Sequence, residues 1–221
     1  MGVSLFALGF VAERAEARVE FDVGARVGYA IAAGRVAEKD SLDPVSSENL
    51  SDWAKGEIPL ALELNIRVIP MLALGAYAEL APAIIGSNVS ASCDAANRDC
   101  FMLGFHLGLM AHFHVLPHQP IDPWVGLGIG IETLGVSGKG SEQTRTITLG
   151  GFEVPLRVGV DFKLSEKFYL GPYVGYTFGT FGAFGTRCEG SGCPSDQNID
   201  IENTASHGWF GFGAKLTVLA F

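Results

Sequence analysis

The sequence predicts an all-β fold in which eight antiparallel strands follow one another and close into an up-and-down barrel with a polar, glycine-rich interior. Apolar and polar residues alternate with a period of two along most of the chain, which is typical of strands with two different faces. The connections between these segments are alternately long and short. Glycine fills 29 of the 221 positions, where an average usage of about 7% gives roughly 15.

The composition excludes several other classes of protein. Apolar residues make up 48% of the chain and are spread along its length, so the chain is not intrinsically disordered. The net charge is −9 and no segment is a basic run, which argues against a nucleic-acid partner bound through counterion release. No fixed-period repeat or low-complexity tract is present, which excludes solenoids and collagen-like fibres.

Eight segments carry the alternation, with bulky apolar residues on one parity and glycines or charged residues on the other. Apolar residues take the odd positions of residues 19–31, the even positions of residues 57–68 and 72–84, and the odd positions of residues 101–115. They then take the odd positions of residues 124–132 and the even positions of residues 152–163, 168–179 and 209–218. Each segment is therefore predicted to be a strand with one apolar and one polar face.

Two of these strands contain predicted irregularities. In the sixth strand, Gly150-Gly151 is expected to shift the parity of the apolar residues, and Pro155 to remove a hydrogen bond from the ladder. In the last strand, Leu219 and Phe221 fall on the opposite parity from the apolar residues before them, and a bulge near the end of the strand would restore the phase.

The lengths of the connections predict the topology. The long polar connections span residues 35–56, 87–100, 134–146 and 183–206, and the short ones span residues 69–71, 117–121 and 165–167. Because long and short connections alternate, all long connections lie at one rim of the predicted barrel. Eight strands in this order form an antiparallel meander.

Packing volume predicts which face of the barrel points outward. The interior of an eight-stranded barrel is just wide enough for side chains to fill, so small and polar residues belong inside and the bulky aliphatic residues outside. Such an apolar exterior exceeds the patch that a soluble monomer tolerates, which favours lipid as its solvent. A soluble barrel with an apolar cavity would need the reverse pattern. A membrane helix over residues 68–86 is opposed by Pro70, Glu79 and Pro82.

Three pairs of phenylalanines on the apolar face are spaced by a distance close to the thickness of a membrane. At about 3.3 Å per residue and a tilt near 40°, the members of each pair lie roughly 25–30 Å apart along the barrel axis. The pairs are Phe101 with Phe113, Phe152 with Phe162, and Phe168 with Phe178. Two interpretations remain open: the pairs mark two aromatic belts, or they are ordinary lipid-facing residues.

These features resemble the small eight-stranded outer-membrane β-barrels of bacteria, of the OmpA, OmpX and OmpW kind, over residues 18–221. The resemblance implies a location in the outer membrane of a Gram-negative bacterium, with outer-membrane lipid and lipopolysaccharide as partners. It also implies insertion by the barrel-assembly machinery, which reads a terminal aromatic residue, here Phe221. A monomer without cofactors is expected.

Residues 1–17 are predicted to be a signal peptide. The apolar segment 4–12 precedes Ala15-Glu16-Ala17, which places small residues at the positions that a signal peptidase requires. A buried N-terminal helix is the alternative, and the lack of Lys or Arg ahead of the apolar segment opposes export.

Four cysteines lie in two of the long connections: Cys93, Cys100, Cys188 and Cys193. Three disulfide connectivities are possible. We expect local pairing, because each local pair closes a short loop and all four residues lie at one rim in an oxidising compartment. A zinc site of four thiolates is the alternative, although the spacings lack the usual C-x2-C form.

The polar parity of the strands predicts an ion-pair network that fills and stabilises the barrel. Thirteen residues are assigned to it: Asp22, Arg26, Glu63, Arg67, Glu79, His106, His112, His114, Glu132, Glu153, Arg157, Asp161 and Lys215. The three histidines share one strand face, and with Glu79 and Glu132 they offer a metal site as an alternative. A polar network satisfies these residues equally well, so no metal site is predicted.

The expected function is a structural or surface-interaction role through four loops, without catalysis. A narrow pore or a conduit for small hydrophobic ligands is the first alternative. A lipid A-modifying enzyme is the second, and Ser206 with His207 would supply its reactive pair. Asp196, Asn198 and Asp200 imitate the start of a calcium loop, but Ile201 replaces the glycine that an EF-hand needs, so a solvated acidic loop is preferred.

Overall fold

The computed structural model describes residues 20–38, 49–201 and 204–220. Its strands are β1 (Glu20–Gly34), β2 (Ala54–Glu57), β3 (Leu60–Ile69), β4 (Leu72–Ile85), β5 (Asp99–His114), β6 (Ile121–Lys139), β7 (Gln143–Lys163), β8 (Phe168–Gly190), β9 (Gln197–Asp200) and β10 (Ser206–Leu219). Two short helices, α1 (Leu50–Trp53) and α2 (Ser87–Ala95), lie between strands. The predicted signal peptide and the terminal Phe221 fall outside the described residues.

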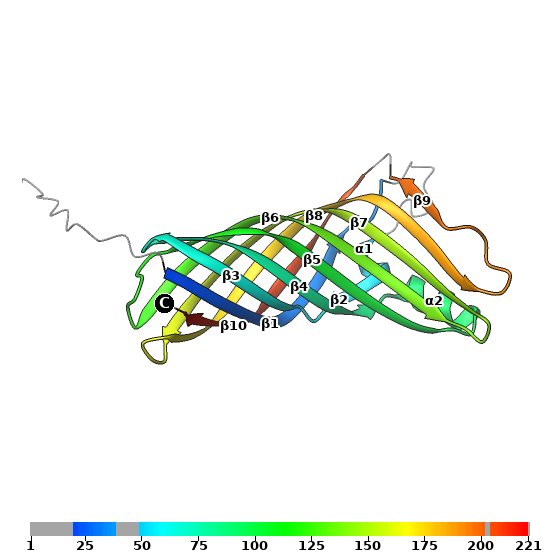
Figure 1. Ribbon diagram of the computed structural model, residues 1–221. Helices are drawn as coiled ribbons and strands as arrows, with labels where there is room; N and C mark the ends of the chain where they lie inside the picture. Colours follow the sequence, from blue (N-terminus) through cyan, green and yellow to red (C-terminus); the bar gives the residue numbers. More distant parts are fainter. Residues whose placement is uncertain (1–19, 39–48, 202–203, 221) are drawn as a thin grey trace, which may run out of the picture.

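The strands form a closed antiparallel ring, as predicted (Figure 1). Each main strand pairs with its neighbour along the chain, and β10 closes the ring by pairing with both β1 and β8. Strands β2 and β3 together occupy one position in the ring, because both pair with β1 and β4. They are separated at Ile58-Pro59, where proline has no N–H to donate to the ladder. The ring therefore has eight strands, and β9 pairs with β8 beyond it.

The two ends of the barrel differ as the sequence predicts. At one end, here called the turn end, short connections at residues 70–71, 115–120 and 164–167 join the strands. At the other end, here called the mouth, lie α1, α2 and β9 (Figure 1). In the part of the chain that is described, no helix is long and apolar enough to cross a membrane.

One of the four predicted long loops is wrong. Residues 134–146 are not a loop: β6 and β7 stay paired up to Lys139 opposite Thr144, and only residues 140–142 connect them. Likewise β8 continues to Gly190, into the loop predicted for residues 183–206. The pattern of outward-facing apolar residues ends near residue 133 because the apolar residues change faces there, whereas the strands themselves continue.

The exterior of the barrel is apolar over most of the length of its strands. Leu62, Leu64 and Leu109 are 64%, 65% and 61% exposed, and all six phenylalanines of the predicted pairs also point outward. The predicted inside-out arrangement is therefore present, and lipid is the solvent that suits this face. The outward direction of the phenylalanines is compatible with both interpretations given above.

The interior consists of two zones with opposite chemistry. The polar bore, on the turn-end side, holds the eighteen polar or charged residues that are buried in the described part of the chain. The apolar cap, on the mouth side, is a cluster of Ala30, Ala32, Val36, Ala37, Leu50, Trp53, Ala54, Met102, Leu134, Val136, Leu149, Phe181, Phe184, Ile201 and Trp209. Leu134 and Val136, which fall in a predicted loop, thus point inward and help to close the barrel near its mouth.

Interior glycines make room for the few large side chains of the bore. A Cβ atom on Gly108 would lie 2.7 Å from the Tyr77 hydroxyl, and one on Gly159 would lie 2.6 Å from the Trp124 ring. Because neither distance is compatible with a side chain, these positions require glycine. The high glycine content therefore reflects the narrow bore.

The irregularity of the sixth predicted strand is real, but its expected consequence is wrong. The register between β7 and β8 shifts at Gly150/Gly151, where Gly150 is opposite Ala183 and Gly151 is opposite Phe181. The unpaired residue is therefore Gly182 of β8, and β7 keeps its parity, with Leu149 and Glu153 both pointing inward. The bulge expected near the C-terminus is not seen among the described pairs, because β1 and β10 pair without a shift up to Leu219.

Candidate functional site in the barrel interior

The structure places all thirteen predicted network residues inside the barrel, where none is more than 7% exposed. They come from seven of the strands, so the ring brings together side chains that are far apart in the sequence. Five further buried polar residues were missed: Glu57, Asn65, Asp122, His207 and Thr217. Parity identifies Asp122, because it shares the even positions of β6 with Trp124 and Glu132.

Near the turn end, carboxylates pair with cations and ring N–H groups. The Arg67 guanidinium lies 3.4 Å from Asp22, which also accepts a hydrogen bond of 2.7 Å from the Asn65 amide. His114 Nδ1 lies 2.8 Å from Asp122 Oδ2. The Trp124 indole donates to Asp161 over 2.9 Å. Each of these contacts joins different strands and fixes the ring at this level.

The middle of the bore contains a chain of ion pairs. Arg26 Nε lies 2.6 Å from Glu63 Oε1, and its Nη2 lies 3.3 Å from Glu79 Oε2. Arg157 approaches the same Glu79 oxygen to 3.5 Å, and the Lys215 ammonium lies 3.9 Å from Glu63. The ammonium also sits 4.3 Å from the centre of the Trp124 ring. This layer links five strands with alternating charges.

Below the apolar cap, two histidines contact carboxylates. His207 Nε2 lies 2.5 Å from Glu132 Oε1, and the Trp209 indole donates to the other oxygen of Glu132 over 3.3 Å. His106 Nδ1 lies 2.7 Å from Glu153 Oε2, and the Tyr77 hydroxyl donates to Oε1 of the same carboxylate. Both carboxylates therefore have two partners.

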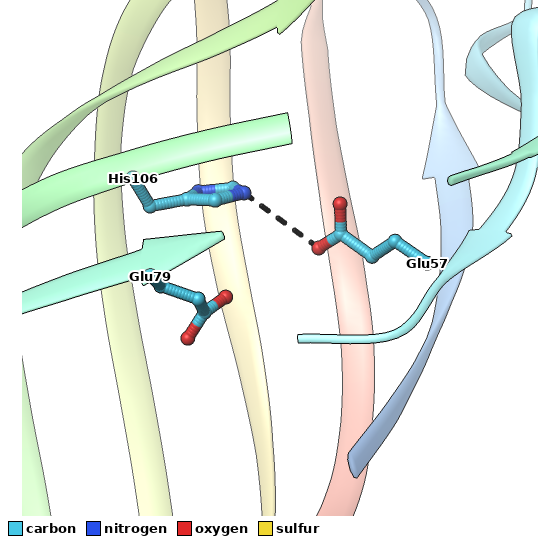
Figure 2. Close-up of side chains that lie close together, drawn as sticks. All are labelled: Glu57, Glu79 and His106. Carbon is cyan, nitrogen blue, oxygen red and sulfur yellow. Dashed lines mark ion pairs between the residues drawn. The ribbon is translucent and has the colours of Figure 1, made fainter. Parts of the chain in front are cut away.

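A second carboxylate group faces the other side of His106. Figure 2 shows Glu57 from β2, Glu79 from β4 and His106 from β5 pointing toward one another. His106 Nε2 lies 3.7 Å from Glu57 Oε1, and each of the three residues has a ligand-type atom within 4.8 Å of those of the others. Together with Arg26, Arg157 and Trp209 they line a cavity of about 20 Å³. This cluster differs from the metal-site alternative of the sequence, because it contains Glu57 and lacks His112, His114 and Glu132.

The mouth carries both disulfides and a larger pocket. Cys93 is bonded to Cys100, and Cys188 to Cys193, so the expected local pairing is the pairing seen. A pocket of about 270 Å³ lies between α2 and strands β5 to β7. Its lining combines apolar residues of the cap and of α2 with two guanidinium groups: Trp53, Val89, Val136, Ile147, Arg98 and Arg145.

Two other sequence-based alternatives lose their geometric basis. Ser206 is exposed whereas its neighbour His207 is buried, because successive side chains of a strand point to opposite faces. The two residues therefore do not form a nucleophile–base pair. Two of the three residues of the calcium-loop alternative, Asn198 and Asp200, lie in the extended strand β9 and are exposed, as in the preferred solvated acidic segment.

The fold is similar to that of solved outer-membrane proteins. Neisserial surface protein A (NspA) matches with a TM-score of 0.52 and 12% identity, over 90% of this chain and 96% of that chain. A major outer membrane protein from Thermus thermophilus matches with a TM-score of 0.61 and 13% identity, over 90% of this chain and 99% of that chain. AlkL, solved by solid-state NMR in lipid bilayers, matches with a TM-score of 0.50 and 14% identity, over 96% of each chain.

No protein-family model and no curated protein matches the sequence. At these low identities, the structural similarity concerns the fold, and it agrees with the resemblance that the sequence predicts. The chain has the fold of the small outer-membrane β-barrels.

Proposed function

We propose that this outer-membrane barrel is an anchored surface protein whose strands hold the mouth above the membrane and whose interior is closed. The filled interior is the observation that supports this proposal. The polar bore is filled with buried side chains, most of which contact an oppositely charged group or a hydrogen-bond partner, and the apolar cap covers it on the mouth side. The cavity among the bore residues measures about 20 Å³, which is close to the space that one water molecule needs.

A planar-bilayer recording tests the closed interior. The folded full-length protein is expected to give no discrete current steps, because ions cannot pass a bore without connected water. Insertion is checked by resistance of the membrane-embedded strands to protease. Discrete openings of the inserted protein would instead support the narrow-pore alternative and overturn this part of the proposal.

The orientation of the barrel is tested with epitope tags at its two ends. A tag inserted at Ser141, in the hairpin between β6 and β7, is expected to bind antibody on intact cells. A matched tag at Glu166, in the turn between β7 and β8, is expected to bind antibody only after the outer membrane is permeabilised. The reverse result would place the mouth in the periplasm and end the surface role.

The proposal includes the partners implied by the resemblance. Lipid contacts the apolar exterior, and lipopolysaccharide surrounds the mouth side of the strands. The barrel-assembly machinery inserts the chain by reading Phe221, so Phe221→Ala is expected to lower the amount of folded protein in the membrane. We propose a monomer, because the ring closes within one chain and each of its eight strands is paired on both sides.

The mouth pocket supports a second candidate function, the binding of a small amphiphile with an anionic head. Its lining includes the apolar residues Trp53 and Val136, while Arg98 and Arg145 provide positive charge. Medium-chain fatty acids are suitable probes, and their binding is expected to change the tryptophan fluorescence of the protein. Replacing both arginines by glutamine should weaken binding, whereas Lys139→Gln at the same rim should not. An unchanged affinity in the double variant would exclude this candidate.

A further inference from the structure

The bore contains more buried carboxylates than buried cations. Among the described residues, eight Asp or Glu and four Lys or Arg are buried, which leaves a formal charge of −8 + 4 = −4 with neutral histidines. Most of these carboxylates have a close cationic or ring N–H partner. Buried charges without compensation are strongly unfavourable, so the remaining ones require protons or a bound cation.

Glu57 is the carboxylate with the poorest compensation. It is 1% exposed, and its Oε2 atom has no hydrogen-bond partner. Its ion-pair contact is with His106 Nε2, at 3.7 Å from Oε1, which is too long for a hydrogen bond. Glu57 therefore offers carboxylate oxygens to the cavity that it lines.

His106 is oriented toward the same cavity. Its Nδ1 atom is held at 2.7 Å from Glu153 Oε2, and its Nε2 atom has no hydrogen-bond partner although the residue is only 4% exposed. A histidine that binds a metal through one ring nitrogen usually donates its other N–H to a carboxylate, which fixes the ring and its tautomer. Glu153 supplies that carboxylate here.

Glu79 completes the group. Arg26 and Arg157 both contact its Oε2 atom, at 3.3 and 3.5 Å, so the carboxylate is held in place. Two ligands at about 2.1 Å from a tetrahedral metal ion are roughly 3.4 Å apart, which is close to the 3.7 Å between His106 Nε2 and Glu57 Oε1. The ligand atoms of the three residues lie within 4.8 Å of one another, so the cluster would have to contract to give metal–ligand distances.

The space at the centre of the cluster depends on Gly104. A Cβ atom at this position would lie 3.0 Å from Glu57 Oε2 and 3.3 Å from His106 Nε2. The glycine thus leaves room between the two unpartnered atoms. The cavity of about 20 Å³ that the three residues line is large enough for one water molecule or one metal ion. Trp209, a member of the apolar cap, lines the same cavity.

We propose that His106, Glu57 and Glu79 bind one divalent transition-metal ion inside the barrel, with Zn²⁺ as the ion best suited to one imidazole and two carboxylates. Water fills the fourth position of the ion. A second grouping of His106, Glu132 and Glu153 is also close enough in space, but both oxygens of each of its carboxylates already have a hydrogen-bond partner, whereas Glu57 Oε2 has none. The ion neutralises part of the excess negative charge and ties β2 to β4 and β5.

Metal retention after folding tests the site without depending on slow entry into the closed bore. The full-length protein is folded from denaturant into detergent micelles in the presence of Zn²⁺ and then dialysed against metal-free buffer. Bound zinc is measured by mass spectrometry of the element. Wild type is expected to retain about one ion per chain, and folding of each variant is checked by heat-modifiable migration in gels.

Gly104→Ala is the sharpest variant, because it keeps all three ligands and fills the space between them. It is expected to lose the zinc, whereas the matched control Gly135→Ala, whose Cβ would meet its nearest atom at 3.8 Å, should retain it. Glu57→Gln should lose the zinc as well. His112→Gln removes another buried histidine of the bore and should leave binding intact. Glu153→Gln should weaken binding by about 10- to 100-fold through the loss of orientation.

Visible absorption after folding with Co²⁺ gives an independent readout. The wild type is expected to show the intense bands of a tetrahedral cobalt site, and Gly104→Ala should lack them. Wild type that folds but retains no zinc would overturn the proposal. Equal retention of zinc by wild type, Glu57→Gln and Gly104→Ala would also overturn it, because the metal would then bind elsewhere.

Discussion

The polar bore and the apolar cap are built from the same strands, yet the residues that point inward are polar in the bore and apolar in the cap. In the part of β6 nearer the turn end, Gly126 and Glu132 point inward and Leu127 points outward. Nearer the mouth, Leu134 and Val136 point inward. The strand keeps its parity throughout, so the change lies in the residue types alone. The difference indicates that the solvent outside changes along the strand, from lipid beside the bore to water beside the cap.

This comparison teaches why the strands are so long. A membrane needs about 9–11 residues of a tilted strand, but β7 and β8 have 21 and 23 residues. The additional residues extend the barrel toward the mouth. This extension has an apolar interior and a polar exterior, as in a water-soluble barrel, whereas the part nearer the turn end has the reverse arrangement of a membrane barrel. The cap then closes the bore without a separate plug domain.

The largest effect is expected from breaking one ion pair of the bore. Glu63→Leu leaves the buried Arg26 and Lys215 without their shared carboxylate, and an uncompensated buried charge costs about 3–5 kcal/mol. The free energy of unfolding in urea, in detergent micelles, measures the loss. Arg26→Leu added to Glu63→Leu should restore part of it, because Glu79 keeps its contact with Arg157 while Lys215 still lacks Glu63.

An exposed ion pair provides the control for this experiment. Lys163 and Glu166 lie 3.0 Å apart at the turn end, and Glu166 is 91% exposed at its side chain. Lys163→Ala is expected to leave the unfolding transition where it is, because solvent screens such pairs. A comparable loss in both variants would show that the bore pairs are no more important than surface pairs.

A leucine truncation should have different effects in the two zones. Leu149 is fully buried in the cap, so Leu149→Ala is expected to cost about 2–5 kcal/mol. Leu62 faces lipid, so Leu62→Ala removes contacts that lipid tails replace, and the loss should be much smaller. The same urea titration measures both. Equal losses would mean that the cap is not a packed core.

A charged substitution on the exterior sharpens the boundary between lipid and water. Leu107 lies midway along β5 between the exposed Phe101 and Phe113, and Leu107→Arg is expected to cost about 2–4 kcal/mol if it lies near the middle of the membrane. Thr148→Arg, on β7 beside the cap, should be tolerated because its side chain reaches water. Folding into lipid vesicles, followed by urea titration, measures the two changes. A well-tolerated arginine at position 107 would contradict a lipid-facing assignment there.

The membrane-type half of this fold can be predicted from the sequence, and the other half cannot. The alternation of Val, Leu and Ile with Gly over residues 124–132 is unambiguous, because only one face of a narrow barrel accepts bulky side chains. Beyond residue 133 the apolar residues lie on the inner face of β6. A prediction that expects apolar residues only on the outer face therefore ends the strand too early. Leu134 and Val136 therefore fall in a predicted loop, whereas both lie in β6 and point inward.

The candidate site could be predicted only in part, for a related reason. The parity of His106 and Glu79 places both in the bore, and they are paired across β4 and β5. Glu57 stands at the edge of its predicted strand, before Pro59, where the chain leaves one strand and begins the next. Its approach to His106 depends on the stagger of β2 and β3 around the ring, which no local pattern reveals.

The smallest effect on the barrel is expected from the disulfide of α2. No residue of this helix is buried, so the segment from Ser87 to Ala95 contributes little to the cooperative unfolding of the strands. Replacing Cys93 and Cys100 by serine should therefore leave the urea transition almost unchanged and instead accelerate protease cleavage within α2. Limited proteolysis of the folded protein measures the rate of that cleavage.

The outcome of this last experiment bears on how the mouth is coupled to the barrel. The helix lines the mouth pocket through Val89, and the disulfide ties its C-terminal half to the start of β5. If local opening of α2 is independent of the strands, cleavage accelerates while the barrel stays folded. A matching drop in the unfolding free energy would show that α2 and the cap unfold together, and the mouth would then be part of one cooperative unit with the bore.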